Sequence, residues 1–107
     1  MDEGLDVRAM AHFARRHVWE NLRTRPLRVC LLIAGMMWVD DEGLYQPHLY
    51  WLDEYGSLQK IQYGAHGHGA NFLLSILDQS YRPDLTRAEA VRLMEECFKQ
   101  LRSRYVV

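Results

Sequence analysis

The chain is 107 residues long, with 49% apolar residues, 25% charged residues and a formal net charge of −1. Such a chain builds one small domain or part of a larger one, and its twelve aromatic residues (three Trp, six Tyr, three Phe) exclude a disordered chain. The near-neutral charge argues against a nucleic-acid binder, because phosphate contacts need a surplus of Lys and Arg.

The longest apolar run, residues 29–39, is about half of the length that a membrane span requires. The first four residues, Met-Asp-Glu-Gly, lack the basic and apolar regions of a signal peptide. Cys30 and Cys97 both lie within apolar patterns, which predicts buried free thiols in a reducing compartment rather than a disulfide. We therefore expect neither membrane nor nucleic acid as a partner.

The first predicted element is an amphipathic helix of about five turns, capped by Asp6 and stopped by Pro26. Its apolar positions recur at steps of three and four residues: Val7, Met10, Ala14, Val18 and Leu22. Arg23, Arg25 and Arg28 gather near the C-terminal end of this helix, where cations suit the helix dipole.

Three strands are predicted next. Residues 27–39 are apolar at nearly every position, which favours a strand with both faces covered. A tight acidic turn over 40–43 leads to a second strand over 49–52, whose entry Pro47 confines to a sheet edge or to irregular backbone. A turn over 53–57, with Gly56 at positive φ, leads to a shorter strand over 58–63. The middle of the chain is thus an antiparallel meander.

Two helices complete the predicted order. Residues 71–77 are apolar almost all round, which indicates a helix buried between layers, and Pro83 prevents its continuation. Thr86 and Glu89 form a capping box for the last helix. One face of that helix is apolar: Ala90, Met94, Cys97, Phe98, Leu101 and Tyr105. A three-stranded sheet with these helices has more apolar surface than partners to cover it, so we expect further strands or partner subunits.

No catalytic constellation is evident in the sequence, because no serine, threonine or acidic pair lies beside a base and an orienting group. His66 and His68, joined by His48, His12 or His17, are candidates for a zinc site, although no Cys or carboxylate lies at ligand spacing. The glycines of 64–69 precede a helix and are a weaker candidate for an anion site, without the ending of a P-loop. Close backbone packing is the simpler role for these glycines.

Several stretches resemble the middle of a proteasome β subunit, most closely the non-catalytic type-2 kind at the fourth β position. The resemblance spans roughly residues 8–105, and no cofactor is implied. The stretches that carry it are Phe-Ala-Arg-Arg at 13–16, Asn-Leu-Arg-Thr-Arg-Pro at 21–26, Val-Cys-Leu-Leu-Ile-Ala-Gly at 29–35, Leu-Tyr-Trp-Leu-Asp at 49–53, Ala-His-Gly-His-Gly-Ala at 65–70, Leu-Ser-Ile-Leu-Asp at 74–78 and Tyr-Arg-Pro at 81–83. One departure is Met36-Met37-Trp38, where the family usually has a short polar bend.

The resemblance implies an α+β fold, the four-layer αββα sandwich of N-terminal-nucleophile hydrolases, of which this chain is the central portion. Residues 1–107 would be a single partial domain that lacks the N-terminal strands and the closing C-terminal strands. Active members use an N-terminal threonine with a lysine and an aspartate on early strands, positions that these residues do not contain. Ala70 stands where active members have a supporting serine, and alanine has no hydroxyl to hydrogen-bond or relay a proton.

The resemblance thus implies a structural, non-catalytic subunit of the 20S core, in the cytoplasm and the nucleus, that helps form the β ring and the proteolytic chamber. Its partners would be β subunits of the same and the opposite ring and α-ring subunits. The interface candidates are His66, His68, Tyr45, Tyr50, Trp51 and Tyr55, with core packing as the alternative for Tyr50 and Trp51. Two other interpretations stay open: a catalytic threonine hydrolase whose nucleophile segment is missing, and a small stand-alone α/β metal-binding domain.

Overall fold

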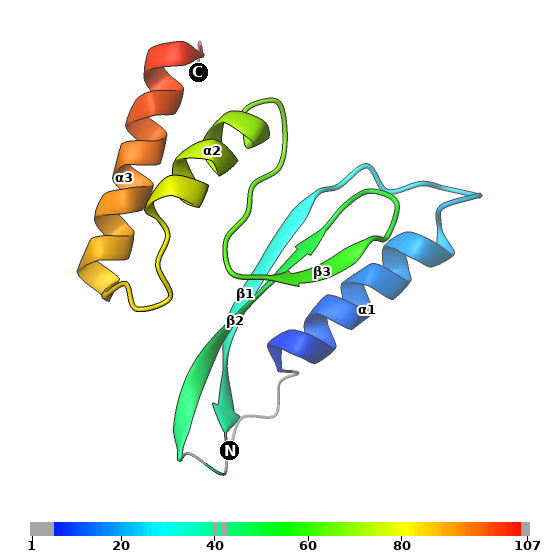
Figure 1. Cartoon of the computed structure of the whole chain (residues 1–107). Coiled ribbons are helices and arrows are strands. Elements are labelled where there is room, and N and C mark those ends of the chain that lie inside the picture. The colour runs from blue at the N-terminus through cyan, green and yellow to red at the C-terminus, as the bar shows by residue number, and fades with distance from the viewer. Residues whose placement is uncertain (1–5, 40, 42, 106–107) are drawn as a thin grey trace. The chain divides into compact units, whose positions relative to one another are not determined.

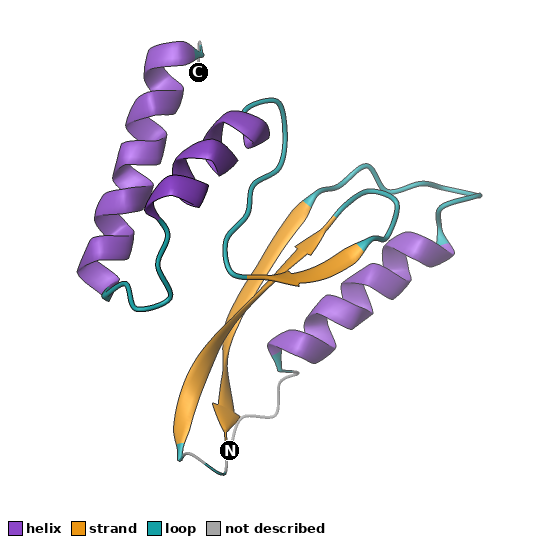
Figure 2. Ribbon diagram, in the orientation of Figure 1, coloured by secondary structure: helices purple, strands orange, loops and turns teal. Residues whose placement is uncertain are grey.

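The computed structural model describes residues 6–39, 41 and 43–105, and its described part contains three helices and three strands (Figures 1 and 2). The chain divides into two compact units, Met1–Gly64 and Ala65–Val107. The first unit holds α1 and a three-stranded sheet, and the second holds α2 and α3. The fold is therefore α+β, as predicted, while the single partial domain over 1–107 stays a prediction.

Helix α1 runs over Val7–Glu20, and Asp6 caps it as predicted, because its carboxylate accepts a 2.7 Å hydrogen bond from the Ala9 backbone N–H. The predicted extent was wrong, since α1 ends before Asn21 and well short of Pro26. The Asn21 side-chain amide donates to the His17 carbonyl at 2.7 Å and satisfies one of the last carbonyls of the helix. The arginines predicted at the helix end therefore lie beyond it.

Strands β1 (Leu31–Val39), β2 (Leu44–Leu52) and β3 (Leu58–Ile61) form the predicted antiparallel meander in the order β1-β2-β3. Positive φ angles at Gly43 (63°) and Gly56 (84°) serve the two turns between them. Asp40 and Glu42 of the predicted acidic turn lie outside the described residues. β1 begins four residues later than predicted, which leaves Cys30 exposed before the strand rather than buried.

The entry to β2 also differs from the prediction, because β2 begins at Leu44 and includes Pro47. Pro47 pairs with Met36 of β1, whereas β3 pairs with β2 only from Leu49 to Leu52. At Pro47, β2 is thus bordered by a described strand on one side alone. Proline has no backbone N–H to donate. On the side of β2 away from β1, no described strand needs that hydrogen bond at Pro47, so a proline is tolerated there.

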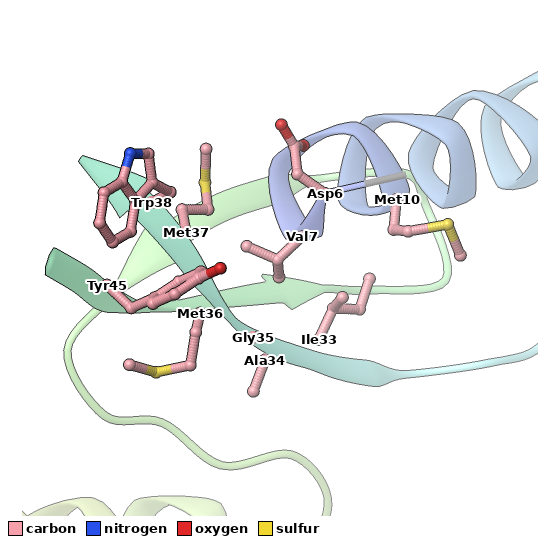
Figure 3. A pocket seen from close by; sticks show the side chains of 10 residues that line it. All are labelled: Asp6, Val7, Met10, Ile33, Ala34, Gly35, Met36, Met37, Trp38 and Tyr45. Carbon is pink, nitrogen blue, oxygen red and sulfur yellow. The ribbon is translucent and has the colours of Figure 1, made fainter. Parts of the chain in front are cut away.

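Helix α1 covers one face of the sheet, where Val7 and Ala11 pack with Tyr50 in a core that Ile33 and Met37 border (Figures 1 and 3). Gly35 lets the helix approach closely, since a Cβ at this position would lie 2.9 Å from the Val7 Cβ. Half-buried residues alternate with exposed ones along β1, so within this chain one face of the strand is covered by α1, and the predicted cover of the other face stays a prediction.

In the second unit, α2 (Ala70–Ser80) packs against α3 (Arg87–Arg104). Leu77 is the one buried residue among those described in α2, so the layers predicted to enclose this helix are not both present within this chain. Cys97 of α3 is buried, as predicted, and burial raises the pKa of its thiol, with a smaller effect from Glu96. This thiol therefore stays protonated and packs as a small apolar group.

The predicted capping box begins α3. The Glu89 backbone N–H donates to the Thr86 hydroxyl at 3.2 Å, and the Thr86 backbone N–H donates to the Glu89 carboxylate at 2.9 Å. The backbone hydrogen bond from Thr86 is the main reason that the pKa of Glu89 lies below its ordinary value of 4.5, with further lowering by Arg82. Arg82 contacts Glu89 at 3.3 Å.

The capping box predicts an acid-sensitive second unit. A carboxylate whose pKa is lowered by folding stabilises the fold above its unfolded pKa, and this contribution disappears as the pH falls through the folded pKa. We expect the α3 amide protons to exchange more slowly in the parent protein than in Glu89→Gln, and this difference in protection to be largest at neutral pH. It should decline below pH 4.5. Thr86→Ala removes the hydroxyl that caps α3. In that variant, the effect of Glu89→Gln on hydrogen exchange should depend less on pH. An unchanged pH dependence would show that the Thr86 hydroxyl does not lower the pKa of Glu89.

Candidate assembly surfaces

The sheet face that points away from α1 is apolar except at one glutamine. By the strand register this open face consists of Leu32, Ala34, Met36, Trp38, Tyr45, Pro47, Leu49, Trp51, Gln59 and Ile61. Within the described strands it contains no charged side chain, whereas a sheet face in contact with water is normally polar. Leu32, Met36, Trp38 and Tyr45 are among its exposed members. This composition suits burial against a further protein layer.

A cleft lies between the beginning of α1 and the outer half of β1 (Figure 3). Met10 and Val7 line it from the helix, and both faces of β1 contribute, with Ile33 and Met37 on the side of α1 and Met36 on the other side. β1 is an edge strand of the sheet, so the cleft lies along a backbone edge that no other described strand borders. Its acidic residue, Asp6, is engaged in capping α1. The cleft therefore offers apolar contact and a strand edge rather than catalytic groups.

The structure separates the four aromatic interface candidates. Tyr45 is exposed and meets Trp38 edge to face, with 5.1 Å between the ring centroids. Tyr50 is 6% exposed and belongs to the core beneath α1, which leaves little surface for a neighbouring subunit. Trp51 is half-buried on the open face, and Tyr55 is exposed in the turn before β3.

The histidine candidates do not assemble into a metal centre. His66 is half-buried and His68 exposed in the loop before α2, and His12 and His17 are exposed on α1. His48 lies on the α1 side of β2, opposite Gly35, with its Nδ1 buried and unpaired among the described residues. Across the described ranges, no three His, Cys, Asp or Glu side chains are grouped so that they could hold a metal ion. Ala70 is the first residue of α2, directly after the loop.

Sequence reasoning missed other exposed apolar side chains. Met94, Phe98 and Tyr105 belong to the apolar face predicted for the last helix, and all three are exposed in this chain. Tyr105 lies 6.4 Å from Phe72 between ring centroids, and the Arg104 guanidinium lies 4.6 Å above the Phe72 ring. On α1, Phe13 and Trp19 are exposed as well. Among the described residues, none of the helices is both long and apolar enough to cross a membrane.

Comparisons with known proteins identify the family of this chain. The family described as "Proteasome subunit" matches residues 2–107. A probable proteasome subunit beta type-4 from Schizosaccharomyces pombe is 39% identical over 101 residues, which cover 94% of this chain and 50% of the relative. Proteasome subunit beta type-2 from Trypanosoma brucei brucei is 38% identical over 108 residues (96% and 52%). Proteasome subunit beta type-4 from Saccharomyces cerevisiae is 35% identical over 104 residues (96% and 50%).

An α+β unit whose described part leaves an apolar sheet face uncovered is typical of a portion of a larger protein structure. The chain belongs to the proteasome subunit family, and the relatives it matches are β subunits of type 2 and type 4. The predicted family resemblance is thereby confirmed. The chain spans about half the length of the curated relatives it matches.

Proposed function

We propose that this chain is the central portion of a structural, catalytically silent β subunit of the 20S proteasome core particle. In this role it helps to build the β ring and the wall of the chamber in which neighbouring subunits cut peptide bonds. The observation that carries the proposal is the open face, a sheet surface without a charged residue in a chain of this family. Such a face is stable only when another protein layer covers it.

For the part of the open face that lies beside β3, the proposed cover is the second sheet of a four-layer αββα sandwich, formed by segments that the relatives have in their other half. Where β1 pairs with the part of β2 that β3 borders, the outer edge of β1 has no described strand beside it, and a further strand would extend the sheet there. The exposed apolar residues of α3, Met94 and Phe98 among them, would face the second sheet in the same arrangement. This fold is the one that the family resemblance implies.

The catalytically silent role is supported by Ala70. If the supporting serine of active members stood at this position, its hydroxyl would lie at the first residue of α2, after the Gly64–Gly69 loop. A methyl group neither accepts nor donates a hydrogen bond, so it cannot assist a terminal amine as an acid or a base. The chain would therefore position neighbours and shape the chamber without performing the hydrolysis.

The proposed partners are β subunits of the same and the opposite ring and subunits of the α rings, in the cytoplasm and the nucleus. Closed rings need two different surfaces on each subunit, one for each neighbour. Exposed aromatic residues such as Phe13, Trp19, Tyr45 and Tyr55 supply candidate anchors for these contacts. The histidine loop with His66 and His68 is a further candidate, and no cofactor is needed.

The experiment is purification of the full-length protein from its source through an affinity tag, followed by native mass spectrometry. We expect a sub-megadalton particle with many different subunits, because the open face and the exposed helices need partners. A mechanism-based reagent for N-terminal threonines should label other subunits of the particle and leave this protein unlabelled. A small free monomer would refute membership in a core particle.

The two alternative functions give different results in the same experiment. Labelling of this protein by the threonine reagent would favour a catalytic subunit, against the alanine at position 70. Tight zinc binding that is lost in a His66→Ala, His68→Ala double variant would favour the metal-binding domain. Unchanged assembly of that double variant would remove the histidine loop from the subunit interface.

A further inference from the structure

The outer part of the β1–β2 hairpin extends beyond the rest of the sheet (Figure 1). β1 and β2 are paired from Leu31↔Leu52 to Val39↔Leu44, whereas β3 pairs only with Leu49–Leu52. Beyond Leu49, the hairpin is thus a two-stranded ribbon with no third strand among the described residues. A two-stranded ribbon is at best marginally stable in water, so contacts on its faces decide whether it persists.

Large apolar side chains are exposed on this ribbon. Met36 is 56% exposed, Trp38 52% and Tyr45 60%, and Leu44 on the other face is exposed too. Trp38 and Tyr45 are directly opposite each other in the register, and Figure 3 shows their rings side by side. Their edge-to-face contact holds the two rings in one arrangement, which reduces the entropy that binding a partner would cost. We call Met36, Trp38, Leu44, Tyr45 and Asp41 together the ribbon end.

The charge around the ribbon end is negative. Asp41 is exposed in the turn, and the sequence places Asp40 and Glu42 on either side of it. Between Arg28 and Lys60 the chain contains no Lys or Arg, so the hairpin carries no cation of its own to balance these acids. Negative charge beside aromatic anchors disfavours nucleic acid and anionic lipid surfaces as partners, and favours a cationic protein surface.

We propose that the ribbon end docks into an apolar pocket rimmed by Lys and Arg on an adjoining subunit of the assembly. Trp38 and Tyr45 enter the pocket as anchors, and Asp41 faces the cationic rim. The inference rests on the proposed function and adds the chemistry of one neighbour.

The test places a photo-crosslinking phenylalanine analogue at position 45 of the full-length protein in the assembled particle. We expect crosslinks to a Lys- and Arg-rich segment of a different subunit. The same analogue at Gln59, on β3 and outside the ribbon, is the matched control and should not crosslink to that segment. Crosslinks from position 45 to the protein's own chain, to a second copy or to a segment without cations would overturn the proposal, as would an absence of crosslinks.

Charge reversal is the second measurement. Asp41→Lys should slow incorporation into the particle by about two- to tenfold at low salt, and the difference should fade at high salt. Glu95→Lys reverses an exposed acid on α3 and is the control. Equal rates for the two variants would overturn the proposal. If neither variant nor parent enters a particle, the proposed function itself fails, whereas a particle without the expected crosslink refutes the docking contact alone.

Discussion

Replacement of Leu52 by alanine is expected to lower the free energy of unfolding of the first unit by about 2–5 kcal/mol. Leu52 is 0% exposed and ends the central strand β2, with Leu31 of β1 opposite it on one side and Leu58 of β3 on the other. Deletion of its isobutyl group removes apolar burial and leaves a cavity that neighbouring strands, held by their ladders, fill only in part. Chemical denaturation of the full-length protein, followed by tryptophan fluorescence, measures the change.

Leu44→Ala is the matched control, because Leu44 begins the same strand and is exposed. The transfer free energy of a side chain already in water is small, so this variant should cost less than about 1 kcal/mol. If the two variants lost equal stability, Leu52 would not be the buried member of the pair, and the placement of β2 at the centre of the sheet would be wrong.

Gly35→Val is expected to lower the free energy of unfolding of the first unit by about 1–3 kcal/mol. The valine Cβ would lie 2.9 Å from the Val7 Cβ, closer than two carbon atoms pack, so α1 must shift away from β1. Val7 and Ala11 are buried by this contact, and displacement of α1 exposes them. Urea denaturation gives the loss of stability, and hydrogen exchange in α1 shows where it arises.

The control for this substitution is Ala34→Val, one residue earlier on the open face, with both variants measured in the 107-residue chain, where Ala34 is exposed. Valine generally favours a strand over glycine or alanine, so without the contact to Val7 both substitutions would be neutral or slightly stabilising. We expect Ala34→Val to behave in this way. A Gly35→Val protein as stable as its parent would show that α1 does not lie against β1 at this point.

Local signals in the sequence predicted the beginnings of α1 and α3 and the turn before β3. Asp6, Gly56 and the Thr86–Glu89 pair act within three or four residues of chain, so their hydrogen bonds and φ angles follow from sequence spacing alone. The beginning of β2 was missed because Pro47 indicates the end of a strand unless the neighbouring strand is known to stop short of it. The strand register, in contrast, could have been predicted. Counting the same number of residues backward and forward from the 40–43 turn pairs Trp38 with Tyr45, as the structure does.

The candidate surfaces depended more on tertiary structure. Tyr50 and Tyr45 are of one residue type on one strand, yet Tyr50 packs beneath α1 and Tyr45 is exposed. Neither outcome follows from residue type, because burial depends on which face the helix covers. In the same way, Met94 and Phe98 lie at the three- and four-residue spacing of an apolar helix face. That they are exposed follows only from how α2 packs against α3.

The sequence by itself determined the family, the order of helices and strands, the caps and turns, and the excess of apolar surface. These properties depend on residue type and short spacing, which a linear chain already contains. Only the tertiary structure decided that α1 covers a single face of the sheet, that the opposite face lacks any charged side chain among the described strands, and that the hairpin extends past β3. Each of these depends on contacts between residues far apart in the chain, and such contacts are selected by packing rather than by local preference.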